Sequence, residues 1–122
     1  MIVGQTIAAI DSTGSTTITT VYTPWIATWG NTAIFSHEII SMDGAVLSFV
    51  AKVYTKNSED ADPGTAKGTP NSQTTAGTYS ITDATGLLEF VRIEFALSVR
   101  AIGGVSLGFA HFRALNPSWK TN

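Results

Sequence analysis

The sequence predicts an all-β fold, an antiparallel two-sheet β-sandwich of the jelly-roll kind with about seven or eight strands. The first observation is residues 91–99, where every odd position is apolar: Val91, Ile93, Phe95, Leu97 and Val99. A period of two is the spacing of a strand with one buried face. The second is a similar alternation in residues 45–55, and the third is that no segment carries convincing helical spacing. With 122 residues, the chain is expected to form one domain, residues 1–122.

Two long hairpins are expected to dominate this fold. Gly103-Gly104 separates residues 91–99 from the apolar stretch 105–115, and glycine adopts the positive φ angles of tight turns. We therefore expect residues 91–115 to form the central antiparallel hairpin. Asp43-Gly44 is a similar turn signal, which predicts a second hairpin over residues 33–55. Its buried face is expected to carry Leu47, Phe49, Ala51 and Val53.

The remaining elements are shorter. Residues 2–10 suit a first strand or an arm on a neighbouring subunit, and a turn is expected at residues 11–15. Residues 16–22 are rich in threonine on both faces, which predicts a half-exposed edge strand that Pro24 ends. Residues 25–31 are expected to be irregular, residues 78–82 a short strand, and residues 116–122 a tail.

Residues 56–77 differ in character from the rest of the chain. They contain almost no apolar side chain beyond alanine, and they hold two prolines and three glycines. Such a stretch predicts a long polar surface loop, too polar to bury and too long for a simple turn. It is expected either to embrace a neighbouring subunit or to be mobile.

The low content of charge is the most informative feature of the composition. Charged residues make up 13% of the chain, against about 25% in an average soluble domain. A charge-poor β domain predicts a surface that is largely covered by other protein. The net charge of −2 argues against binding nucleic acid by phosphate neutralisation, and no apolar run is long enough to span a membrane. The absence of cysteine excludes disulfides and thiolate metal sites.

The search for catalytic chemistry favours a protein that is not an enzyme. His37 and His111 each lie in a predicted strand, where histidine is usually structural, although both could share a face beside Glu38 or Asp43 and bind a metal. The acidic cluster in residues 59–62 lacks the spacing of a calcium-binding EF-hand loop and predicts a solvated loop tip. Nucleophile and phosphate-binding motifs are absent. The sequence therefore predicts no catalytic residue, no cofactor and no metal.

The aromatic residues are the strongest candidates for binding. Trp25, Trp29 and Trp119 fall in segments predicted to be irregular. Tryptophan in such places caps the end of a sandwich, anchors a protein interface or stacks on a sugar. The candidate interface residues are Trp25, Trp29, Trp119, Tyr54 and Tyr79.

One pattern resembles a known class of proteins. Residues 90–95 (FVRIEF), a glycine turn, residues 105–109 (VSLGF) and a short tail resemble the closing hairpin of small β-sandwich virion proteins of tailed bacteriophages. Residues 49–58 (FVAKVYTKNS) are similar to the mid-chain strand of that class, so the likeness covers about residues 45–115. Such proteins decorate or cement the capsid or form minor parts of the head or tail, and no catalytic set is carried over from them.

The resemblance implies a structural protein of the virion. It would bind copies of itself, with a trimer as one closed form, and a major capsid or other virion protein, but neither nucleic acid nor membrane. Two alternatives remain open. One is a carbohydrate-binding module that uses Trp25, Trp29 or Trp119 as a stacking platform. The other is an enzyme, which would require His37 and His111 to converge with a carboxylate.

Overall fold

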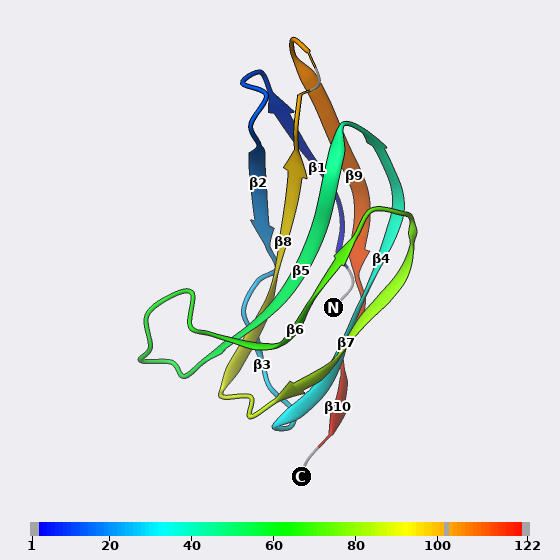
Figure 1. Ribbon diagram of the computed structural model, residues 1–122. Helices are drawn as coiled ribbons and strands as arrows, with labels where there is room; N and C mark the ends of the chain where they lie inside the picture. Colours follow the sequence, from blue (N-terminus) through cyan, green and yellow to red (C-terminus); the bar gives the residue numbers. More distant parts are fainter. Residues whose placement is uncertain (1–2, 102, 121–122) are drawn as a thin grey trace.

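The computed structural model describes residues 3–101 and 103–120 and confirms an all-β, two-sheet antiparallel sandwich (Figure 1). No helix able to cross a membrane occurs within those residues. The described strands are β1 (Val3–Asp11), β2 (Thr17–Tyr22), β3 (Ile26–Ala27), β4 (Thr32–Gly44), β5 (Val46–Lys56), β6 (Thr65–Gln73), β7 (Gly77–Thr85), β8 (Phe90–Val99), β9 (Ser106–Ala114) and β10 (Ser118–Lys120).

Both sheets have five strands, and their order is that of a jelly roll. The first sheet runs β1-β9-β4, with β7 on the free side of β4 and the short β10 in line with β9. The second sheet runs β2-β8-β5-β6, with the two-residue β3 continuing the line of β2 along β8. Apart from β5 and β6, which pair within the second sheet, consecutive long strands lie in opposite sheets, which is the arrangement of the eight-stranded double Greek key. The connections β1–β2, β4–β5 and β8–β9 gather at the upper end of Figure 1.

Both predicted hairpins are wrong, although their strands are correct. Strand β8 pairs with β2 and β5, whereas β9 pairs with β1 and β4 in the other sheet. Strands β4 and β5 likewise lie in different sheets, and β4 runs on through the expected turn at Asp43-Gly44 to a corner at Ala45. The physical reason is that each strand has one apolar face. When two such strands lie in opposite sheets, their apolar faces meet in the core and both are buried. The glycine turn remains, with φ angles of 74° at Gly103 and 79° at Gly104.

The predicted loop over residues 56–77 is also wrong in its central part. Residues 65–73 form β6, an edge strand that pairs with β5, so only residues 57–64 form a loop before it. An edge strand needs backbone hydrogen bonds on one side only, so it tolerates polar side chains on both faces. Pro70 lies where the β5–β6 register shifts, which is a position open to a residue without an N–H.

Smaller differences concern strand ends. Strand β7 is longer than residues 78–82, the expected tail contains β10, and the segment 25–31 contains β3. Strand β1 pairs with β9 of the same chain, which confirms the strand reading of residues 3–10, while residues 1–2 lie outside the described part. Strand β2 is an edge strand, as expected. Leu47 is exposed rather than buried, because the β5–β8 register shifts between Val46 and Ser48.

The core is an aromatic cluster between the two sheets. Phe95 of β8 and Phe49 of β5 stack with ring centroids 5.6 Å apart in one sheet. Phe112 of β9 reaches them from the other sheet, at 4.6 Å from Phe95 and 4.9 Å from Phe49. All three rings are essentially inaccessible to solvent, as are the five alternating apolar side chains predicted on β8.

One buried carboxylate ties the upper end together. Asp11 is fully shielded from solvent and accepts hydrogen bonds from the hydroxyls of Thr13 and Thr17 and from the N–H groups of Thr13, Gly14 and Ala101. Ala101 follows β8, so this carboxylate links the two sheets. These bonds, led by the one from the Ala101 N–H, lower the pKa of Asp11 from 3.8 to about 2.

The Asp11 carboxylate gives a testable pH dependence. Because its pKa is lowered in the folded chain, its contribution is complete above pH 3.8 and is lost as the pH falls through about 2. We expect Asp11→Asn to lower the melting temperature at pH 7. It should also reduce the difference between the melting temperatures at pH 5 and pH 2. Thermal unfolding followed by circular dichroism checks this. An unchanged pH profile in Asp11→Asn would show that the carboxylate does not stabilise this end.

Candidate functional site

The two histidines do not form a site. His37 is buried on the inner face of β4, with ring centroids of Phe95 and Tyr79 at 5.6 and 5.9 Å. His111 lies on the outer face of β9, where its Nδ1 shares a 2.8 Å hydrogen bond with Thr6 Oγ1. The two imidazoles thus lie on opposite faces of one sheet, and the expectation that they could share a face is wrong. Within residues 3–101 and 103–120, no three potential ligands cluster for a metal.

His37 is held neutral by its surroundings. Burial lowers its pKa from 6.5 to about 4, and its Nε2 is enclosed without a hydrogen-bond partner. A buried polar atom without a partner costs about 1–3 kcal/mol. His37 is therefore a core residue that carries an energetic penalty.

This penalty predicts the effect of His37→Phe. The folded chain resists protonating His37, whereas the unfolded chain does not. The free energy of unfolding should therefore be independent of His37 protonation above pH 6.5 and should fall as the pH drops from there through about 4. We expect His37→Phe to remove that fall and to raise the free energy of unfolding at pH 7 by about 1 kcal/mol. Urea unfolding at pH 7, 5.5 and 4 measures both effects. A variant with the wild-type pH dependence would contradict this reading of His37.

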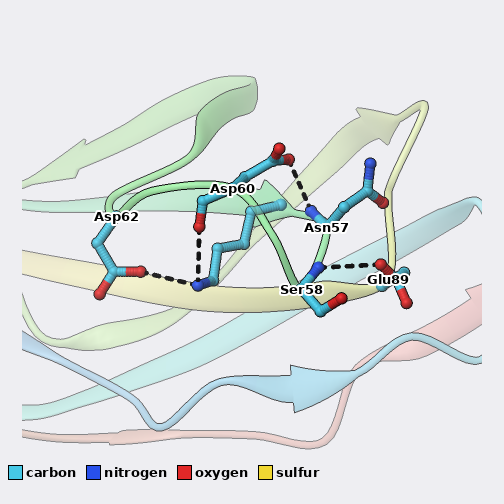
Figure 2. Close-up of polar contacts among 6 residues, drawn as sticks. Asn57, Ser58, Asp60, Asp62 and Glu89 are labelled. Carbon is cyan, nitrogen blue, oxygen red and sulfur yellow. Dashed lines mark hydrogen bonds and ion pairs between the residues drawn. The ribbon is translucent and has the colours of Figure 1, made fainter.

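The acidic loop is built from internal contacts, as Figure 2 shows. Lys56 Nζ lies 3.1 Å from the carboxylate of Asp62 and donates to the carbonyl oxygen of Asp60. The Asp60 carboxylate accepts the N–H of Asn57, and Glu89 accepts the N–H of Ser58 at 2.9 Å. These carboxylates thus accept hydrogen bonds or ion pairs from groups of the same chain, as expected for a solvated loop. Glu89 lies in the loop before β8.

Trp25 lies on the outer face of the second sheet, covered by cations. The guanidinium carbon of Arg92 lies 4.5 Å from the Trp25 ring and 4.0 Å from the Tyr22 ring, and Lys56 Nζ lies 5.1 Å from Trp25. Each such contact contributes about 0.5–1 kcal/mol at an exposed site. Tyr54 is the cross-strand neighbour of Arg92. Trp25 and Tyr54 therefore belong to one intramolecular cluster.

Tyr79 is engaged within the fold. Its ring lies beside His37, and its hydroxyl donates to the carbonyl oxygen of Thr75 at 2.8 Å. It closes the turn between β6 and β7.

Trp29 and Trp119 come together at the lower end of the sandwich. They line a groove of about 280 Å³ with Ile26, Ala27, Asn116 and Pro117. Trp29 is 82% exposed, whereas Trp119 is half-buried and meets Phe35 edge-on at 5.9 Å. The sequence singled out both tryptophans but gave no indication that they share a groove, because the pairing of β10 with β4 joins them.

A second set of exposed side chains, which sequence reasoning missed, lies at the upper end. Nine large hydrophobic side chains are exposed among the described residues, and five of them lie at or beside the connections of this end. We call these five the apolar end: Ile10, Ile18, Leu47, Val105 and Leu107. Ile10 and Leu107 are direct cross-strand partners on the outer face of the first sheet. A signal was present in the sequence: strands such as β1 and β9 carry apolar residues at outward positions, Ile10 and Leu107, as well as at their inward positions.

The connections that carry the apolar end are held in place. Ala45 donates its N–H to Leu107 at 3.1 Å, and Arg100 donates its N–H to Ala45 at 3.2 Å. Arg100 Nε donates to the carbonyl oxygen of Gly14 at 3.0 Å. A shallow hollow of about 430 Å³ lies among these connections, lined by Gly14, Ala45, Val46, Leu47, Arg100 and Ala101.

Comparison with known proteins adds no relative to this picture. No protein-family model, curated protein or solved structure matches the chain. Its function is therefore argued from the geometry of these surfaces.

Proposed function

We propose that this protein is a non-enzymatic structural subunit that forms a homo-oligomer and docks on a larger assembly, most specifically as a capsid decoration or cement protein of a bacteriophage. The observation that carries the proposal is the apolar end. The exposed fractions of Ile10, Ile18, Val105 and Leu107 lie between 51% and 71%. Scattered exposed hydrophobic residues are normal on a protein surface, whereas a group of them marks an interaction surface.

The energetics favour burial of this end against protein. Moving a Val, Leu or Ile side chain fully out of water contributes about 1.5–3 kcal/mol. Ile10 and Leu107 are neighbours, so one partner surface can cover both. Arg100 is the cation of the adjacent hollow, and its Nε is already bonded to Gly14.

Low surface charge supports the same proposal. At 13% charged residues, the chain lacks the ionic surface that keeps solitary domains dispersed. A repeated subunit can accept modest contacts because linked copies bind with avidity. The five apolar side chains need not provide high affinity alone.

The assignment to a virion rests on the sequence resemblance and on an analogy of fold. Jelly rolls occur in viral capsid proteins and in lectins, among others. Fold alone does not fix function, so this analogy supports the virion reading without deciding it. His37 and His111 lie on opposite faces of the sheet, so they do not converge with a carboxylate as the enzyme alternative required.

The proposal predicts that a charge at the apolar end dissociates the oligomer. We expect the wild-type 12.9 kDa chain to sediment as a closed oligomer, with a trimer as the leading form, and Leu107→Asp to sediment as a monomer. Burying an unpaired carboxylate in an interface is strongly unfavourable. Sedimentation velocity measures the mass, and circular dichroism verifies folding.

Ile40→Asp is the matched control. Ile40 is 46% exposed on β4, away from the apolar end, so the same chemical change there should leave the oligomer intact. A wild-type chain that remains monomeric at high concentration and binds no phage shell would contradict the proposal. Equal dissociation by both substitutions would show that the apolar end is not the interface.

A further inference from the structure

The groove at the lower end holds an exposed indole on a fixed backbone. Thr28 donates its N–H to Glu89 at 3.0 Å and its hydroxyl to Leu88 at 2.7 Å. On the other side of Trp29, the Asn31 carbonyl oxygen accepts the N–H of Leu87 at 2.9 Å. The backbone is thus anchored directly before Trp29 and two residues after it, while the side chain remains 82% exposed.

Gly30 brings this segment against the last strand. A Cβ at Gly30 would clash with the backbone carbonyl oxygen of Lys120 in β10, so no larger residue fits without a shift of the backbone. This close approach sets Trp29 beside Trp119, which lies one residue before Lys120. A binding group that is already ordered loses less conformational entropy when its ligand arrives.

The lining of the groove specifies the chemistry of a ligand. Its six residues, Ile26, Ala27, Trp29, Asn116, Pro117 and Trp119, carry no charge. Trp29 and Trp119 offer apolar indole surface, and the Asn116 amide offers both hydrogen-bond donors and acceptors. A neutral sugar ring has the matching properties: apolar C–H faces, hydroxyl groups around its edge and no charge.

A large protein partner fits this end less well. A stable protein interface buries about 1,600 Å² around an apolar centre, with hot-spot residues near its middle. The only other large hydrophobic side chain in the exposed group near Trp29 is Leu88, at 37%, and the neighbours Thr28 and Ser118 are polar. We propose that the Trp29–Trp119 groove binds a neutral oligosaccharide, with the Trp29 indole stacked on a sugar ring and Asn116 bonded to its hydroxyls. This site is separate from the apolar end.

The test uses four neutral probes: cellohexaose, xylohexaose, mannohexaose and hexa-N-acetylchitohexaose. Each is titrated into the full chain while tryptophan fluorescence and the NMR signals of the indole N–H groups are recorded. We expect at least one probe to shift the signals of Trp29 and Trp119. Trp29→Ala should weaken that binding about tenfold or more, because stacking on the indole is lost.

Two further variants separate the site from general effects. Gly30→Ala keeps both indoles but displaces the Trp29 segment from β10, so it should also weaken binding. Tyr22→Ala removes another aromatic ring, 45% exposed on the second sheet, and should leave binding unchanged. Circular dichroism verifies that each variant folds.

The outcomes are distinct from those for the oligomer. Leu107→Asp should keep sugar binding, and Trp29→Ala should keep the wild-type mass in sedimentation. The proposal is overturned if no neutral probe, at about 10 mM, shifts the NMR signal of the Trp29 indole N–H. That concentration exceeds the largest dissociation constant of interest. A heparin-derived acidic hexasaccharide is titrated as a charged comparison, and the proposal is also overturned if it alone binds. The same holds if Tyr22→Ala weakens binding as much as Trp29→Ala does.

Discussion

The packing of Phe95 against Phe49 and Phe112 is the contact on which this structure depends. It joins strands from both sheets at a centre that is closed to solvent. Each sheet has one apolar face, and neither face is stable in water alone. Once these faces meet, the order of strands places all connections at the ends or edges of the sandwich. The two candidate binding surfaces are consequences of that arrangement, since both lie where strands end.

The two ends differ in how their backbone is fixed and in what they expose. At the upper end, Asp11 and Arg100 use their charges to hold the connections and leave apolar side chains in water. At the lower end, backbone hydrogen bonds around Thr28 and the close approach at Gly30 hold one exposed indole over an uncharged groove. The upper end thus suits a protein partner, and the lower end suits a small neutral ligand. On the proposed function, a subunit that is anchored by its upper end presents the lower end to its surroundings.

The sequence predicted which side chains are buried better than it predicted which strands are neighbours. The alternation on β8 is a local property, so the burial of Val91 through Val99 follows from it. The partner of a strand is not local, and a glycine turn such as Gly103-Gly104 serves a connection between sheets as well as a hairpin. Leu47 was predicted to be buried but is exposed, because a register shift reverses its face, and β6 was missed because an edge strand needs no apolar pattern.

For the candidate sites, the sequence named Trp29 and Trp119 but could not join them, because 90 positions separate them and the fold brings them together through the β4–β10 pairing and the close approach of Gly30 to Lys120. The apolar end was missed because Ile10 and Leu107 looked like ordinary strand residues until their faces were known.

Hydroxyl-radical footprinting of the wild-type chain, compared with Leu107→Asp, tests most directly the claim that the apolar end is the interface of the oligomer. The account predicts that Ile10, Val105 and Leu47 are protected in the wild-type oligomer and reactive in the variant, while Trp29 reacts equally in both. Equal reactivity of the apolar end in the two samples would contradict it.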